Sequence, residues 1–361
     1  MNTVVCLSAA PWQSTPTRTQ QLMTRLQGAE VLFFEPPAAS GSREYKKPGR
    51  KVRPGVTAYA LPPIAGEGPL NQLRQRRSRR RLSDYIQNIL ARHDARDALL
   101  WCATPQAVGL LDYLPYKGLV YDCDRYWAEL DPALESELAT QADVIFAASA
   151  GLADRLGPCC DNIAVVPNGC NYPMFAREDI EVPGPVKDIV GPLIGYAGTL
   201  WADLDYRPVL TCIAAHPDWN YIFLGKHEPS PGLKKLRAMK QVILCDRVPL
   251  IEVPDYIRQF DVCMDLQRQG VASDVCPGRV FEYLAAGKPL VRHSYPGQME
   301  DFPPGVAYQS PDLHGFVACC EQAIREDSAW LKNRRRQLGE AAGWDKRAET
   351  VQGILEMNML L

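Results

Sequence analysis

The sequence alternates short apolar runs with longer segments of helical periodicity along almost its whole length. In the first 170 residues, apolar or β-branched runs predict strands at residues 4–8, 31–35, 56–61, 98–102, 119–122, 144–147 and 163–166. Apolar residues recur at helical spacing between most of these runs, near residues 17–28, 71–92, 105–113, 131–140 and 149–156. Such alternation predicts an α/β fold in which helices cover both faces of a parallel sheet.

A second series of the same kind follows a turn-rich stretch between residues 167 and 185. Its first strand is predicted to begin at residue 193, and further strands at 221–224, 242–244, 262–265, 289–291 and 306–308. Helices are predicted near residues 205–215, 232–240, 252–260, 278–286, 311–326 and 327–361. Because 361 residues are also long for one core, we expect one Rossmann-like domain over residues 1–175 and another over residues 186–342.

Composition excludes several classes of protein. The hydrophobic content of 46% and the charged content of 23% are typical of a globular domain. No apolar run reaches the roughly 20 residues that a membrane-spanning helix needs, and the N-terminus lacks the basic region of a secretory signal. We therefore expect a cytoplasmic protein. The twelve cysteines are scattered, and none of the five histidines has metal-ligand spacing to a cysteine, so neither a metal site nor a disulfide framework is predicted.

Positive charge is concentrated near the N-terminus, although the formal net charge of the chain is −2. Residues 1–100 contain 16 Lys and Arg against 7 Asp and Glu, and six arginines fall within eight residues: Arg74, Arg76, Arg77, Arg79, Arg80 and Arg81. No aromatic residue of the kind that favours nucleic acid interrupts this run, whereas anionic lipid headgroups suit it. We predict a helix that associates with the inner face of the cytoplasmic membrane. An exposed helix without a partner is the alternative.

Residues 276–290 have the start and stop signals of a short helix that is followed by a strand. Pro277 suits the first helical turn, Gly278 follows it, and Gly287 stands where a left-handed C-terminal cap is expected. The N–H groups at the start of such a helix can bind phosphate. Arg279 and Glu282 share one face, where a guanidinium can pair with diphosphate and a carboxylate can accept hydrogen bonds from ribose hydroxyls. A purely structural helix is the alternative on these residues alone.

The sequence Pro-Gly-Arg-Val-Phe-Glu-Tyr-Leu-Ala-Ala-Gly-Lys-Pro from Pro277 resembles the donor-site helix of GT-B glycosyltransferases of the GT4 type. The teichuronic-acid and exopolysaccharide transferases resemble it most. Two further segments are similar to this family: Val-Pro-Asn-Gly ending at Gly169, and Trp-Asp-Lys-Arg-Ala-Glu-Thr from Trp344. The resemblance implies two Rossmann-like domains facing a cleft, with a C-terminal helix over about 343–361 that crosses back to the N-terminal domain.

The resemblance also implies where a nucleotide sugar would bind. Glu282 corresponds to the second glutamate of the family's Glu-x7-Glu motif, and Asp274 occupies the position of the first. A Gly-x-x-Gly turn places Gly198 and Thr199 after the first strand of the second half, where backbone N–H groups can bind a pyrophosphate. Arg247 follows a segment similar to the one that holds the nucleotide base, although an exposed arginine is the alternative there.

Acceptor chemistry is expected at the strand ends of the first half. Asp122 and Asp124 follow a predicted strand, and a carboxylate there can orient or deprotonate a hydroxyl. Arg18, near the start of the first helix, can contact a phosphate or the acceptor, or be solvated. Either aspartate can alternatively cap the next helix. A metal-binding Asp-x-Asp of the GT-A type is excluded, since the donor motif lies in a separate α/β unit.

The function implied is transfer of a sugar from a UDP- or GDP-linked donor to a hydroxyl of a lipid-linked or envelope glycan. The family resemblance implies retention at the anomeric carbon and no metal or other cofactor. Asp122, Asp124 and Arg279 are the predicted catalytic residues. A nucleotide-sugar epimerase of the same fold and a non-catalytic membrane partner are the alternatives.

Overall fold

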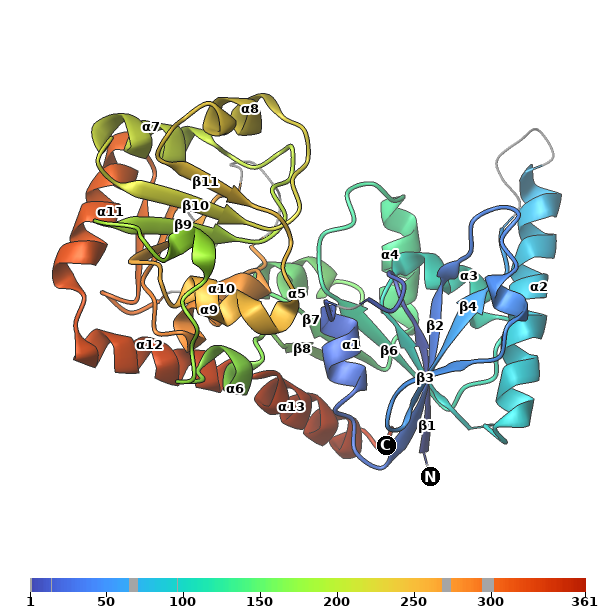
Figure 1. The fold of residues 1–361 in the computed structure, drawn as a ribbon. Helices are drawn as coiled ribbons and strands as arrows, with labels where there is room; N and C mark the ends of the chain where they lie inside the picture. The colour runs from blue at the N-terminus through green and yellow to red at the C-terminus, as the bar shows by residue number, and fades with distance from the viewer. Residues whose placement is uncertain (1, 14, 65–70, 96, 268–273, 294–301) are drawn as a thin grey trace. The chain divides into compact units, whose positions relative to one another are not determined.

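The computed structural model describes residues 2–13, 15–64, 71–95, 97–267, 274–293 and 302–361. The chain forms two compact units, one of Met1–Pro167 with Asp345–Leu361 and one of Asn168–Trp344 (Figure 1). Residues 168–175, expected in the first domain, belong to the second unit. Cys170 and Phe175 are fully buried in its core, and the Cys170 N–H donates to the Ala342 carbonyl at 3.1 Å.

The first unit is built on an eight-stranded sheet in the order β3-β4-β2-β1-β5-β6-β7-β8. Its strands are β1 Asn2–Leu7, β2 Ala29–Pro37, β3 Arg50–Arg53, β4 Val56–Leu61, β5 Leu99–Cys102, β6 Gly118–Cys123, β7 Val144–Ala147 and β8 Ile163–Val165. Val4 of β1 lies opposite Val31 of β2 and Leu99 of β5, in parallel register on both sides. The carboxyl ends of the parallel strands therefore share one edge.

Strand β3 corrects the expectation of a wholly parallel sheet, because it pairs with β4 in antiparallel register. It was missed because its sequence, Arg-Lys-Val-Arg, has the charge of a loop. A turn at Gly55, whose φ is +73°, joins the two strands. Charged side chains on such an outermost strand discourage pairing with another chain.

Helices of the first unit cover this sheet, and most fall where periodicity predicts them. They are α1 Arg18–Met23, α2 Asn71–Arg92, α3 Val108–Leu111, α4 Pro132–Gln141 and α5 Ala150–Leu156, with 3-10 turns at Glu44–Lys46 and Pro105–Ala107. Helix α1 is shorter than expected. Its start is fixed by a reciprocal cap between Thr17 and Gln20, and its last backbone bond reaches Thr24.

The C-terminal segment forms two helices rather than one, α12 Ala329–Ala341 and α13 Trp344–Met357. From Asp345 onward α13 belongs to the first unit (Figure 1). Arg25 donates to Asp345 at 2.6 Å, and Asn162 donates to Asn358 at 2.9 Å. The return of the last helix, which the resemblance implied, is thus present.

The second unit has a six-stranded sheet in the order β11-β10-β9-β12-β13-β14, parallel throughout. Its strands are β9 Leu193–Ala197, β10 Asn220–Leu224, β11 Val242–Cys245, β12 Val262–Asp265, β13 Leu290–His293 and β14 Ala307–Ser310. Its other helices are α6 Tyr172–Phe175, α7 Arg207–Ala215, α8 Pro231–Arg237, α9 Val253–Ile257, α10 Gly278–Ala285 and α11 Leu313–Glu326, with 3-10 turns at Gly184–Val186 and Leu250–Glu252. One buried cluster joins α10 to one face of the sheet, and another joins α7 and α11 to the other face.

Within the described ranges, no helix has both the length and the apolar character needed to cross a bilayer.

Candidate active site

The carboxyl edge of the second sheet carries a buried carboxylate between two arginines. Asp265, the last residue of β12, accepts a hydrogen bond from Arg279 at 2.8 Å, and its other oxygen accepts one from Arg292 at the end of β13. Burial alone would raise the pKa of Asp265, but the two guanidinium groups outweigh it and hold that pKa below its usual range. Two positive charges share one negative charge, so the cluster suits a further anion.

Arg279 is held in place but retains hydrogen-bonding capacity. Its guanidinium lies 5.2 Å from the centre of the Tyr196 ring, as in a cation–π contact. Its Nε atom and the Nη1 atom of Arg292 are buried without a hydrogen-bond partner among the residues that the structure describes. Buried donors of this kind are costly unless a ligand satisfies them.

Glu282 lies one turn after Arg279 on α10 and is partly buried. Burial raises the pKa of this carboxyl to about 7, although the nearby Arg279 charge opposes the shift. In the described part of the chain, its side chain has neither a hydrogen-bond nor an ion-pair partner. Arg279 and Glu282 therefore lie on one face of α10, as predicted, and both have polar atoms without a partner among the described residues.

The start of α10 differs slightly from the expectation. Pro277 is the N-cap rather than a residue of the first turn, and the helix begins at Gly278, with no cap hydrogen bond from the Pro277 side chain. Asn168 donates to the Cys276 carbonyl at 3.0 Å, and a Cβ added at Gly278 would lie 3.2 Å from the Gly169 carbonyl oxygen. Two segments that carried the family resemblance thus meet at this helix start.

The loop after β9 is tied to the same helix. The Ala197 N–H donates to the Tyr283 hydroxyl of α10 at 2.8 Å, directly before Gly198 and Thr199. Gly198 has a φ of +150°, and a Cβ added at Gly225 would lie 2.2 Å from the Gly198 carbonyl oxygen. The close approach requires glycine at position 225, and the positive φ favours glycine at position 198.

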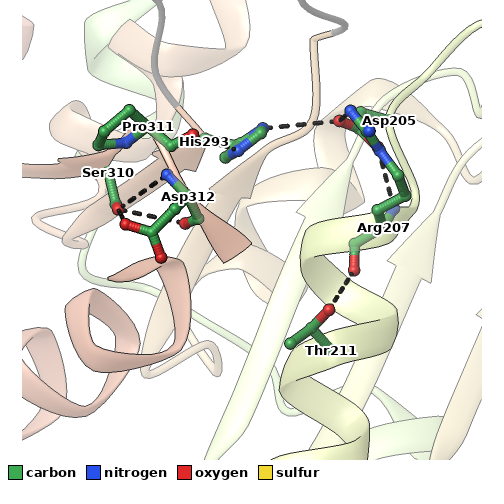
Figure 2. A network of polar contacts seen from close by, with 7 residues as sticks. All are labelled: Asp205, Arg207, Thr211, His293, Ser310, Pro311 and Asp312. Carbon is green, nitrogen blue, oxygen red and sulfur yellow. Dashed lines mark hydrogen bonds and ion pairs between the residues drawn. The ribbon is translucent and has the colours of Figure 1, made fainter. Parts of the chain in front are cut away.

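Farther along the loop after β9, a second polar network was missed in the sequence (Figure 2). Asp205 is buried, accepts hydrogen bonds from the Arg207 guanidinium at 2.6 and 2.8 Å, and lies 3.5 Å from Nδ1 of His293. The His293 Nε2 atom is 3.1 Å from the Pro311 carbonyl oxygen. The Arg207 guanidinium is therefore paired with Asp205. The network joins the ends of β13 and β14 to this loop.

Two other predicted donor residues are less informative. Arg247 is exposed in the loop after β11, and two strands, β9 and β10, separate β11 from β12 in the sheet. Asp274 is partly buried and directly follows residues 268–273, which lie outside the described ranges.

The first unit brings Arg18 and Asp122 together. Arg18 Nε donates to Asp122 at 2.9 Å and its Nη1 donates to the Val166 carbonyl at 2.6 Å, with both side chains buried. The solvated arginine that the sequence also allowed is wrong. Arg18 Nη2 and Asp122 Oδ2 are buried without a hydrogen-bond partner in the described part of the chain.

Asp124 lies two residues after Asp122 at the same edge of the sheet. Burial first, and then the charge of Asp122, raise the pKa of Asp124 to about 6, although Arg18 and Arg125 oppose this shift. Its Oδ1 atom is buried and lacks a hydrogen-bond partner among the described residues.

Among the residues that the structure describes, no group of three or more metal-ligating side chains is close enough to hold an ion.

The structure resembles solved glycosyltransferases over its whole length. Sucrose-phosphate synthase from Thermosynechococcus elongatus matches with a TM-score of 0.75 and 15% identity, covering 99% of each chain. Trehalose-6-phosphate synthase from Burkholderia multivorans matches at 0.73 and 12%, covering 99% of this chain and 98% of the other. The chain has the GT-B fold. HepE from Anabaena, solved in complex with UDP, shares this fold at a TM-score of 0.70 and 13% identity, covering 99% of this chain and all of the other.

A curated relative is also named as a glycosyltransferase. TuaH of Bacillus subtilis (strain 168), named as a teichuronic acid biosynthesis glycosyltransferase, is 23% identical over 379 aligned positions that cover 94% of both chains. No protein-family model matches the sequence.

The predicted arginine run of the GT-B chain lies in the first half of α2. Arg76, Arg77, Arg79, Arg80 and Arg81 are exposed, and the side chain of Arg74 lies outside the described part. Arg81 donates to the Tyr45 hydroxyl at 2.9 Å and lies 5.4 Å from the centre of that ring. The helix is anchored by its later apolar residues: Leu82, Ile86, Ile89 and Leu90.

Proposed function

We propose that the chain is a glycosyltransferase that moves a sugar from a nucleotide sugar to a hydroxyl of a lipid-linked or envelope glycan. The observation that carries the proposal is the pair Arg279 and Glu282, on one face of α10, with buried or partly buried polar atoms that lack partners among the described residues. Phosphate oxygens satisfy a guanidinium, and ribose hydroxyls satisfy a carboxylate. The UDP bound by HepE supports UDP as the nucleotide.

Charge stabilisation is the main role proposed for the second unit. As the bond between the sugar and the diphosphate breaks, negative charge develops on the leaving group. Arg279 would stabilise that charge, assisted by the N–H groups at the start of α10 and by the backbone around Gly198. Asp265 and Arg292 keep the Arg279 guanidinium in place, so that it need not reorganise during the reaction. We propose that this chemistry needs no metal ion.

A proton acceptor is proposed in the first unit. The acceptor hydroxyl must lose its proton as the new bond forms. Asp124, with a pKa of about 6 and a buried oxygen without a partner in the described ranges, is suited to take it at neutral pH. Asp122 is paired with Arg18 and would act by raising the Asp124 pKa. Retention at the anomeric carbon stays a proposal from the family resemblance, and the anomeric configuration of the product, measured by NMR, tests it.

The exposed arginines of α2 support a further part of the proposal. Arg76, Arg77 and Arg80 would attract anionic lipid headgroups and hold the enzyme at the inner face of the cytoplasmic membrane. The name of TuaH, with its reference to teichuronic acid, supports an envelope glycan as the acceptor.

Thermal unfolding with UDP-, GDP-, ADP- and dTDP-sugars tests the donor assignment. A ligand at 100 times its Kd should stabilise the wild-type chain by about 2.7 kcal/mol. Glu282→Ala should lose this shift, whereas Glu252→Gln, at an exposed position of the same unit, should keep it. A shift that survives Glu282→Ala would contradict the assignment. Interconversion of free UDP-sugars without an acceptor would instead favour an epimerase.

A further inference from the structure

A cavity of about 490 Å³ lies in the first unit at the carboxyl edge of its sheet. It is lined by the ends of β1, β2 and β4, by the segments after β5 and β6, and by residues of α2, α3 and α4. Most of its lining is apolar, including Leu7, Phe34, Leu61, Leu82, Leu110 and Leu130. A cavity of this size holds a ligand of a few hundred daltons, and such a lining favours hydrocarbon over a bare sugar.

One wall of the cavity carries a cation with no partner. Arg79 lines the cavity, and among the described residues it has no hydrogen-bond or ion-pair partner. A Cβ added at Gly109 of α3 would lie 2.8 Å from Arg79 Nε and 2.9 Å from its Cζ. The guanidinium therefore rests against the backbone of α3 because position 109 has no side chain.

The loop after β6 offers a buried donor to the same cavity. Trp127 is only 7% exposed and lines the cavity, and its Nε1 atom has no hydrogen-bond partner among the described residues. Arg125 covers the Trp127 ring at 3.9 Å and pairs with Glu129 at 2.9 Å, so the charges of that pair largely cancel. Among the charged residues that the structure describes in the lining, Arg79 is thus the one without a counter-charge.

We infer that this cavity binds the lipid phosphate of the acceptor, with the hydrocarbon next to the phosphate inside it and the phosphate against Arg79. A phosphate oxygen would also satisfy the Trp127 N–H. The exposed arginines that precede and follow Arg79 on α2 favour a lipid source for such an amphiphile over a free anionic metabolite. Describing the bound lipid phosphate as the acceptor rests on the proposed glycosyltransferase function, whereas its binding does not.

Calorimetric titration of the full chain with dodecyl phosphate, below its critical micelle concentration, tests the inference. Octyl phosphate should bind more weakly, by about threefold to fourfold for each methylene removed. Inorganic phosphate and neutral dodecyl maltoside should bind far more weakly still. Equal binding of inorganic phosphate and dodecyl phosphate, or of the maltoside and the phosphate, would overturn the inference, as would no binding of dodecyl phosphate.

Two variants locate the phosphate at Arg79. Arg79→Gln removes the charge, and Gly109→Ala keeps the charge but pushes the guanidinium away from the wall. Each should weaken dodecyl phosphate binding about tenfold or more, since a charge-assisted hydrogen bond is lost. Arg92→Gln, at an exposed position in the last turn of α2, should bind like the wild type. Wild-type affinity of either Arg79→Gln or Gly109→Ala would place the ligand elsewhere and overturn the inference.

The same samples separate this inference from the proposed function. The shift in thermal unfolding with a UDP-sugar depends on Glu282 in the second unit, and dodecyl phosphate binding depends on Arg79 in the first. A chain that binds dodecyl phosphate but no nucleotide sugar would fail as a transferase and still confirm the cavity site. A chain with the opposite behaviour would keep the proposed function and lose the cavity site.

Discussion

Arg279 donates to Oδ1 of Asp265 at 2.8 Å, so the first arginine of α10 is anchored to the last residue of β12. The arginine alone could be proposed from the sequence as a phosphate ligand. The structure adds that a buried carboxylate fixes the guanidinium, which suits it to the phosphate binding that we propose.

Removal of this anchor should be costly. Asp265→Asn leaves two buried guanidinium groups without a counter-charge, and we expect a loss of about 3–5 kcal/mol in the free energy of unfolding at pH 7. Because the folded-state pKa of Asp265 is lowered, its contribution is present above the unfolded pKa and is lost as the pH falls through the folded value. Urea titrations at pH 7 and pH 3 measure both effects. Asp246→Asn, whose carboxyl is 96% exposed, is the control and should change stability little.

At alkaline pH, Glu282 should stabilise the folded chain less than glutamine would at the same position. Its folded-state pKa of about 7 exceeds the unfolded value, so its contribution is present below the unfolded pKa and is lost as the pH rises through 7. At pH 8.5, Glu282→Gln should therefore unfold with a free energy roughly 1–3 kcal/mol higher than the wild type, and at pH 3.5, below the unfolded pKa, the two should agree. Guanidinium titrations at both pH values check this. A variant that is less stable than the wild type at pH 8.5 would show that the carboxylate is satisfied in the folded chain.

Asp124 should set the acid limb of the pH–rate profile. If it accepts the proton of the acceptor hydroxyl, kcat/KM should fall below pH 6, where the carboxyl is protonated. Asp124→Asn should lower kcat by about 10²–10⁴ and remove this limb, while UDP binding persists. The exposed Asp112 provides the matched control, Asp112→Asn, which should retain the wild-type profile. An unchanged acid limb in Asp124→Asn would assign the proton acceptor to another group.

Membrane association should depend on α2 rather than on positive charge in general. Replacement of Arg76, Arg77 and Arg80 by Gln should reduce binding to anionic vesicles about a hundredfold, at roughly 1 kcal/mol for each charge. The matched triple replaces Lys234, Lys235 and Arg237, exposed residues of α8 in the second unit, and should bind like the wild type. Flotation at low and high salt measures both triples. Equal losses from the two triples would reject a role specific to α2.

The sequence predicted the parallel strands and the α10 helix because apolar periodicity is local and strong. It could not predict β3, whose charged residues form a strand only because β4 is there to pair with it. Asp265 and Arg292 were missed for a related reason, since each is a single charged residue at the end of an apolar strand. Their interaction depends on the pairing of β12 with β13, which places Asp265 opposite Arg292. The same limit applied to Arg18, whose partner Asp122 is 104 positions away.

The order of the chain through the two units also bears on how the protein folds during synthesis. The first unit is Met1–Pro167 completed by Asp345–Leu361, so its closing helix is made only after the whole of the second unit. The second unit, Asn168–Trp344, is one uninterrupted stretch, and its two ends are joined by the hydrogen bond from the Trp344 N–H to the Cys170 carbonyl at 2.9 Å. The second unit can therefore complete its fold while the first unit still waits for its closing segment. A ribosome that stops short of Asp345 would release a finished second unit attached to an unfinished first one.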